Sequence, residues 1–420
     1  MVTALWLGTA ERTLVIVSDS TAPEQRRLLV SIPPIAATAL RAVGRGVFLT
    51  LIVVALVHGL LGKQAQAENL ATVFVWPLWF RGVGLLAILA GSPWRVFSPW
   101  RTLYATLERI EGEEIAVLGD YPEWLSVWPA YVGFVAIVGI FGNLTVIPFK
   151  PQLTVFLVAG YALVMLLGGV AFGPRWFEHS DAFEVFYRVL GRAAPFSAIR
   201  ADDGGYDVLL RPPWRGSIKS AQSIALVAFI VSAVYTVSFD GFTRTPEYQT
   251  LSIGVRDVLS IGPTASMVLY LIGLGAFVGS FLLVSEVMRR LADTRDIPQW
   301  ETARAFAPTV IPITAAYEIA HNYPYVLKNF GQFLTVGGAL SEFYGVEVAL
   351  LGWLSLPTFW ISQVVLVVVG HVVAVIAAHA VAVQQYGSHR AAVRAHAPLV
   401  ALMIGYTVLS LWIISRPVVA

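Results

Sequence analysis

Cysteine is absent from this sequence of 420 residues, which excludes disulfide bonds, thiolate-bound metals and cysteine nucleophiles. Charged side chains are scarce as well, at 13% against the roughly 25% of a soluble domain. The net charge of +2 gives no reason to expect a nucleic-acid partner. With 57% hydrophobic residues and a mean hydropathy of +0.72, the sequence predicts an integral membrane protein bathed by the lipid bilayer.

The N-terminus lacks the basic stretch and apolar core of a cleaved signal peptide. Residues 1–43 are mixed in character, with weak strand propensity from Thr13 to Val17. The pair Pro33-Pro34 interrupts the apolar run from Leu28 to Ala42. We expect residues 1–43 to be cytoplasmic or interfacial, 44–414 to form one transmembrane bundle, and 415–420 to be a short external tail.

Long apolar runs indicate about nine membrane-spanning helices, because a span needs roughly 20 apolar residues. The segment 329–352 is apolar too, but it contains five glycines and two glutamates. We interpret it as re-entrant or interfacial, and a tenth span remains the alternative. The predicted spans are 44–62, 70–91, 124–145, 151–172, 219–239, 259–285, 305–327, 356–383 and 395–414.

The distribution of basic residues predicts the orientation of the bundle. With the N-terminus in the cytoplasm, 21 of the 28 lysines and arginines fall in cytoplasmic segments and 6 fall outside. Arg81 is the one that lies in the interior of a predicted span. Because cytoplasmic loops of membrane proteins are enriched in lysine and arginine, we expect a cytoplasmic N-terminus and an external C-terminus in the cell membrane.

Two shorter segments have the pattern of amphipathic helices. The first follows Ser98-Pro99, a favourable N-cap and first-turn pair. The second begins at Asp181, with Glu184 in capping-box position. We expect both helices to lie at the membrane interface and to pack under the bundle as structural elements, with a cytoplasmic regulatory surface as the alternative. We expect the tetrapeptide Ser-Pro-Trp-Arg, which occurs at 92–95 and at 98–101, to anchor the chain in the headgroup layer. The sequence therefore predicts an all-α, polytopic helix bundle.

Ionisable groups within spans are costly and therefore mark functional candidates. The predicted seventh span contains Glu318 and His321, which share a helix face at a spacing that recurs in metal sites of helix bundles. Three prolines, at 308, 312 and 324, should break this helix and free backbone carbonyls, which is tolerated only against protein or a water-filled cavity.

The predicted eighth span places Gln363, His371 and His379 at intervals of eight residues. Eight residues rise about 12 Å, so one metal ion cannot reach both histidines of a regular helix. Together with Arg81, these residues could form a polar path through the membrane. Depth places Arg81 near Glu318, and His321 near His371. Structural ion pairing and interhelical hydrogen bonding remain the alternatives for these groups.

Several local patterns together resemble a known protein family. In order, from about Leu70 to Val383, they are similar to bacterial and archaeal multi-pass membrane proteins called fenitrothion hydrolases. The first 40 residues do not match, and Asn322 stands where that family has an aromatic residue. The patterns are Ser92-Pro-Trp-Arg-Val-Phe-Ser-Pro-Trp-Arg, Tyr121-Pro-Glu-Trp, Asp181-Ala-Phe-Glu-Val-Phe, Ser238-Phe-Asp-Gly-Phe-Thr-Arg-Thr, Pro312 to Tyr323, and Gly370-His with Ala378-His.

The resemblance implies a membrane-embedded hydrolase of organophosphate triesters with a second membrane subunit as partner. It also draws attention to Asp240, which lies on the same membrane side as His321, although Asp240-Gly241 could simply form the turn that leaves its helix. A carboxylate and an imidazole suit a divalent metal such as zinc, which lowers the pKa of bound water.

The leading hypothesis is therefore a metal-dependent hydrolase of phosphotriester-like or other hydrophobic substrates. Asp240, Glu318 and His321 would be its catalytic residues, and Asp240, His321 and His371 its metal ligands. A transporter or permease with an intramembrane polar path is the second hypothesis, because broken helices mark transporter sites. A non-catalytic membrane subunit is the third.

Overall fold

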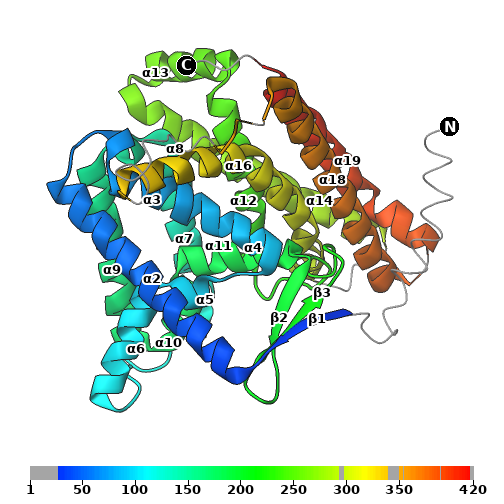
Figure 1. The fold of residues 1–420 in the computed structure, drawn as a ribbon. Coiled ribbons are helices and arrows are strands. Elements are labelled where there is room, and N and C mark those ends of the chain that lie inside the picture. Colours follow the sequence, from blue (N-terminus) through cyan, green and yellow to red (C-terminus); the bar gives the residue numbers. More distant parts are fainter. Residues whose placement is uncertain (1–26, 293–297, 339–349, 353, 388, 417–420) are drawn as a thin grey trace.

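The computed structural model describes residues 27–292, 298–338, 350–352, 354–387 and 389–416. These residues form a bundle of helices with one small sheet at its edge (Figure 1). The predicted all-α, polytopic helix bundle is confirmed. The weak strand expected from Thr13 to Val17 lies outside the described residues.

Eight helical segments of the described chain are long and apolar enough to cross a membrane, so the chain is an integral membrane protein. They coincide with eight of the nine predicted spans. The first begins at Pro34, ten residues earlier than predicted, because Pro33 takes an extended conformation and Pro34 occupies the first helical turn. The segments are α2 (Pro34–Leu61), Leu70–Ala90, Glu123–Leu144, α9 (Pro151–Phe172), α12 (Ile224–Thr243), Gly262–Leu291 with α14 (Ala265–Leu291), α18 (Leu356–Tyr386) and α19 (His389–Ser415).

Helix α12 is the centre of the bundle. Of its most apolar window, 78% is buried inside the protein, whereas α2 and α14 bury only 17%. Ser223 caps the helix by accepting a hydrogen bond from the backbone N–H of Leu226, at 3.2 Å. The low buried share of α2 and α14 leaves their apolar side chains for lipid.

The remaining predicted span, 305–327, corresponds to a short turn (η8, Ala307–Val310) and the helix α16 (Ile311–Val336). This helix is long enough to cross a membrane but carries charged and polar groups, and it packs against α12 and α18. It is also continuous, so the prediction of a broken helix was wrong. Pro308 and Pro312 lie before the helix and in its first turn, where no N–H is needed, and only Pro324 lies inside.

The predicted re-entrant segment 329–352 is only partly described. Residues 329–336 extend α16, which ends at Gly337. Residues 339–349 lie outside the described part of the chain.

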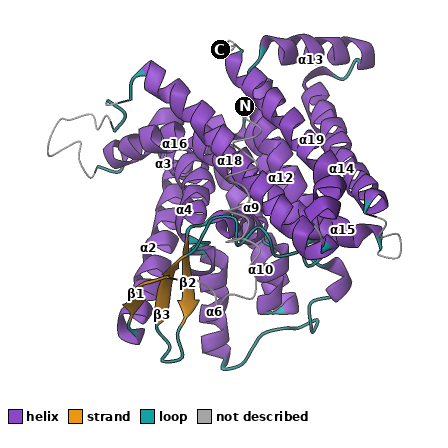
Figure 2. Cartoon of the chain, turned by 90° about the vertical axis from the view of Figure 1, so that its right-hand side faces the viewer, coloured by secondary structure: helices purple, strands orange, loops and turns teal. Residues whose placement is uncertain are grey.

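A three-stranded antiparallel sheet lies at one end of the bundle, which the sequence analysis missed (Figure 2). Strand β3 (Tyr206–Leu210) is central, between β1 (Arg27–Ile32) and β2 (Phe196–Arg200). The same end carries α6 (Pro99–Glu111) and corresponds to the predicted cytoplasmic side. The helix α13 (Pro246–Leu259) lies at the opposite end (Figure 1).

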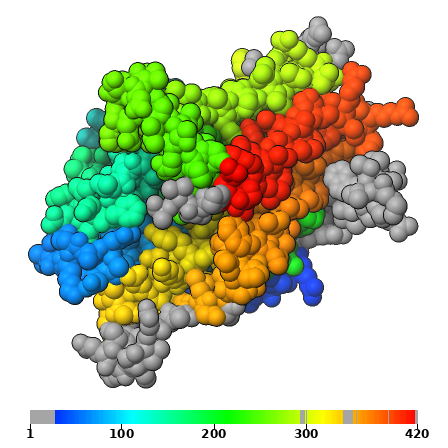
Figure 3. Space-filling view, turned by 90° about the horizontal axis from the view of Figure 1, so that it is seen from above, coloured from blue at the N-terminus to red at the C-terminus, as the bar shows by residue number. Residues whose placement is uncertain are grey.

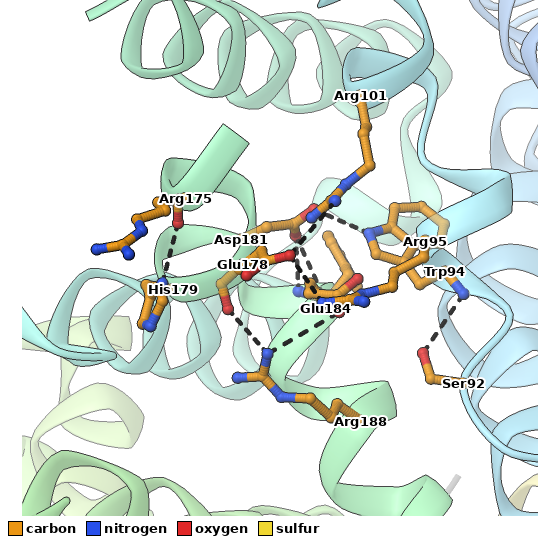
Figure 4. Close-up of polar contacts among 11 residues, drawn as sticks. Ser92, Trp94, Arg95, Arg101, Arg175, Glu178, His179, Asp181, Glu184 and Arg188 are labelled. Atoms are coloured by element: carbon orange, nitrogen blue, oxygen red, sulfur yellow. Dashed lines mark hydrogen bonds and ion pairs between the residues drawn. The ribbon is translucent and has the colours of Figure 1, made fainter. Parts of the chain in front are cut away.

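The predicted amphipathic helix at 181–190 is α11 (Ala182–Leu190), and it is buried within the bundle instead of lying in the interface. Its cap, Asp181, explains this position. The indole N–H groups of Trp94 and Trp100 both donate to Asp181 Oδ2, at 2.8 and 2.7 Å, and the Tyr161 hydroxyl donates to Oδ1 at 2.9 Å. Figure 4 shows Asp181 with Trp94 beside it. Saturated by donors, this carboxylate can enter the protein interior with its helix.

The two Ser-Pro-Trp-Arg repeats therefore form one buried clamp, and the prediction of headgroup anchoring was wrong. Trp94 and Trp100 are 0% and 1% exposed. The arginines of both repeats lie near Glu178 Oε1, Arg95 at 2.7 Å and Arg101 at 3.9 Å (Figure 4). The clamp joins α5 (Trp94–Phe97) and the first turn of α6 to α10 (Pro174–Ser180) and α11.

Helix α6 itself matches its prediction more closely. It runs from Pro99 to Glu111 and is capped by Ser98. Leu103, Leu107 and Ile110 are exposed. An exposed apolar stripe on a short helix suits the membrane interface.

Candidate functional site

A cavity of about 820 Å³, which we call the outer cavity, lies toward the end of the bundle that carries α13 (Figure 1), the end predicted to face outside. Five of the segments that line it lie far apart in the sequence. They are the second predicted span, the end of α12, the middle of α16, the start of α18 and the end of α19. From above, the green, yellow, orange and red parts of the chain meet on this face (Figure 3). The volume is within the range of sites for small organic ligands.

Two walls of the cavity contain π-helical turns, which the sequence analysis did not foresee. The second span is α3 (Leu70–Phe74), a π-helical segment η2 (Val75–Gly82) and α4 (Val83–Ala90). The third is α7 (Trp128–Phe134), a π-helical segment η4 (Val135–Phe141) and α8 (Gly142–Leu144). Wider turns of this kind occur frequently at functional sites. Here they carry Arg81 and, just after η4, Asn143 into the cavity wall.

Arg81 and Glu318 form a buried ion pair, as the predicted depths of the two residues suggested. Arg81 Nη1 lies 3.1 Å from Glu318 Oε1, and their side chains are 14% and 2% exposed. Arg81 also donates to Asn143 Oδ1 at 3.4 Å, and Asn322 Nδ2 donates to Glu318 Oε2 at 2.7 Å. Arg81 lines the cavity, and Glu318 lies directly behind it.

The side chain of His321 lines this cavity, and one of its ring nitrogens is buried against α12. Its Nε2 atom is buried without a hydrogen-bond partner, and its ring packs edge-on against Tyr317 at 5.5 Å between centroids. Gly241 of α12 faces this atom, since a Cβ there would lie 2.9 Å from Nε2. Both Gly241 and its neighbour Asp240 belong to the last turn of α12, so the interpretation of Asp240-Gly241 as a turn leaving the helix was wrong.

Each arginine of the cavity has its own carboxylate. Arg81 pairs with Glu318, and Arg244 Nη2 lies 3.6 Å from Asp240 Oδ1. Arg416, from the end of α19, pairs with Glu247. The charges of the cavity are therefore balanced, which favours a neutral ligand over a strongly charged one. Apolar side chains supply much of the remaining wall, namely Trp76, Phe80, Phe149, Phe183, Phe186, Phe359 and Trp360.

Gln363 has a structural role that explains the proline in α16. Pro324 has no N–H to offer the carbonyl of Ala320, four residues earlier. Gln363 Nε2, from α18, donates a hydrogen bond to that carbonyl. The predicted freed carbonyl is thus satisfied across the helix interface, at the edge of the cavity.

His371 and His379 lie away from the cavity lining. His371 Nδ1 is 2.8 Å from the carbonyl oxygen of Val367, one turn earlier in α18. The His379 ring lies near the rings of His389 and His396, with centroids 5.2 and 5.1 Å apart. Each has a buried Nε2 without a partner, but of the three histidines with such an atom it is His321 that lines the cavity.

The predicted metal site is not assembled in the described part of the chain. No group of three or more histidine, aspartate and glutamate side chains there is placed to hold a metal ion. Asp240 and His321 share the cavity, while His371 does not line it. Comparison with protein-family models, curated proteins and solved structures found no significant match.

Proposed function

We propose that the outer cavity is the active site of a membrane-embedded hydrolase acting on neutral, partly apolar esters, phosphotriesters included. The observation that carries the proposal is the position of His321, which lines the cavity of about 820 Å³ and has a buried Nε2 atom without a hydrogen-bond partner. An unsatisfied polar atom at such a place costs free energy unless a ligand or water engages it. The motif resemblance supports the same reaction class.

His321 is the general base of the proposed reaction. A ring nitrogen of His321 accepts a proton from a water molecule in the cavity. The water oxygen bonds to the phosphorus or carbonyl carbon, the bond to the leaving oxygen breaks, and the leaving group takes up a proton. General-base catalysis of this type contributes about 10²–10⁴-fold to a rate.

The arginines supply the electrostatic part. Arg81 and Arg244 donate to the oxygen that becomes negative during attack, a role for preorganised cationic donors. Glu318 and Asp240 hold these guanidinium groups by ion pairs. The charges of the cavity are balanced before attack. The negative charge that develops in the transition state is then the charge that the two arginines stabilise. No step of this scheme needs a metal.

Hydrolysis of chromogenic carboxylic esters and phosphotriesters by purified, reconstituted protein tests the proposal. His321→Asn keeps a polar group of similar size but removes the base, so we expect kcat to fall by about 10²-fold or more. His371→Asn is the matched control, because that histidine is also buried but does not line the cavity. No activity of the wild type on any ester, or equal activity of the His321 variant, would overturn the proposal.

A permease is the second candidate, favoured by the π-helical segments η2 and η4 in two cavity walls. Such segments could shift between helical registers and so open the cavity toward the other side. Flux of a neutral ester into liposomes, without its hydrolysis and dependent on Arg81, would support transport and count against the hydrolase.

A further inference from the structure

A second cavity of about 490 Å³ lies between α2 and α6, at the end of the bundle predicted to be cytoplasmic. We call it the α2–α6 groove. Its polar lining consists of three threonines and three arginines, and no carboxylate lines it. These residues are Thr38, Arg41, Arg45, Thr102, Thr106 and Arg109.

The two helices face each other with the same chemistry. Thr38, Arg41 and Arg45 follow one face of α2, at spacings of three and four residues. On α6, Thr102, Thr106 and Arg109 follow one face at spacings of four and three. Hydroxyl and guanidinium groups from both helices therefore converge on one space.

The positive charge of the groove is uncompensated. Arg45 and Arg109 take part in no ion pair or hydrogen bond within the part of the chain that the structure describes. Arg41 donates to the Ala37 carbonyl and to Thr38 Oγ1, at 3.2 and 3.1 Å, and has no carboxylate partner there. The outer cavity differs, since each of its arginines is paired. Three unbalanced guanidinium groups around a cavity create a site for an anion.

Guanidinium forks and hydroxyl donors match phosphate oxygens, which accept several hydrogen bonds at once. We propose that the α2–α6 groove binds a phosphate group, and that this group belongs to the headgroup of an anionic phospholipid. The lipid source follows from the flanks, where Leu40, Val43 and Val47 of α2 and Leu103, Leu107 and Ile110 of α6 are exposed. Acyl chains can cover these side chains while the headgroup occupies the groove.

The test uses the full chain in detergent, with short-chain phosphatidylglycerol, short-chain phosphatidylcholine and inorganic phosphate as probes. Thermal unfolding and native mass spectrometry report binding. We expect phosphatidylglycerol to raise the unfolding temperature and to be retained in preference to phosphatidylcholine. Arg45→Gln combined with Arg109→Gln should weaken this binding by about tenfold or more, because hydrogen bonds between a guanidinium and a phosphate are stronger than those between neutral groups.

Two further variants control for the loss of space and for the loss of positive charge elsewhere in the chain. Gly46 also lines the groove and a Cβ there meets nothing within 4 Å, so Gly46→Leu fills the space without removing charge and should also abolish binding. Arg256→Gln removes an exposed arginine from α13, at the opposite end, and should leave binding unchanged.

The outcomes separate the alternatives. Preference for phosphatidylglycerol that is lost in both groove variants supports the proposal. Equal stabilisation by inorganic phosphate alone would overturn the lipid as source, and the same lipid preference in wild type and both groove variants would overturn the site.

Discussion

The ion pair between Arg81 and Glu318 permits a sharp test, because it separates a structural role from a functional one. Arg81→Met leaves the Glu318 carboxylate, 2% exposed, without a counter-ion. Removing one partner of a buried pair costs about 3–5 kcal/mol. Coulomb's law gives a similar figure, about 4 kcal/mol for charges about 4 Å apart at an effective dielectric constant of 20.

The double variant Arg81→Met/Glu318→Gln removes both charges and should recover most of this loss. Asn322 can still donate to the side-chain oxygen of the amide that replaces the carboxylate, as it donates to Glu318 Oε2 in the wild type. We therefore expect each single variant to lose about 3 kcal/mol or more of unfolding free energy, and the double variant to lose less than about 2 kcal/mol. Such non-additivity is seen for residues in direct contact. Thermal unfolding of the four proteins in detergent measures the cycle.

Function is then measured on the same four proteins. If Arg81 stabilises negative charge during hydrolysis, the double variant folds but its kcat stays low. A double variant with wild-type activity would mean that the pair is only structural. If each single variant loses less than about 1 kcal/mol of unfolding free energy, the pair is not buried as we describe, because that is what a solvent-exposed ion pair contributes.

Three further changes test other parts of the structure. Gly241→Ala brings a Cβ to 2.9 Å from His321 Nε2, so it should lower the stability by about 1–3 kcal/mol and slow ester hydrolysis. The control Gly254→Ala lies in open space on α13 and should be neutral or stabilise the protein by up to about 1 kcal/mol. Equal effects of the two variants on thermal unfolding would contradict the close approach. Gln363→Leu orphans the carbonyl freed by the proline of α16 and should cost about 1–3 kcal/mol in thermal unfolding, and an unchanged midpoint would show that water replaces the amide. Burial raises the pKa of Glu184 above its usual 4.5, so the folded chain holds this proton more tightly than the unfolded chain. The stability of the wild type should therefore fall as the pH rises from 4.5 through the raised pKa. Glu184→Gln should remove this pH dependence, and a variant that keeps it would show that Glu184 is not its source.

Much of the candidate site was accessible from the sequence. Arg81, His321 and Gln363 were singled out because polar groups within apolar spans need a reason, and Asp240 was singled out through the family resemblance; all four line one cavity. Gly241 and Arg416 were missed as site residues. A glycine in an apolar run has no chemistry to flag it, and the contact that makes it informative joins two helices distant in the sequence.

The predicted fate of α11 and of the two Ser-Pro-Trp-Arg repeats was wrong for a related reason. An amphipathic pattern shows that one face is apolar, but not whether the polar face meets water or a buried partner. Asp181 finds three side-chain donors inside the protein, from Trp94, Trp100 and Tyr161. Those donors are 20 to 87 residues away along the chain, so no local pattern reveals them.

The sequence by itself determined that this chain is embedded in a membrane and where most of its helices lie, because a span depends on about 20 neighbouring apolar residues. It also determined which polar groups carry a cost. Only the tertiary structure decided the π-helical turns, the pairing of β1 with β3 and the position of His321 in the cavity wall, with its Nε2 atom buried against Gly241. Each of these depends on contacts between segments far apart in the chain, whose energies a local pattern does not contain.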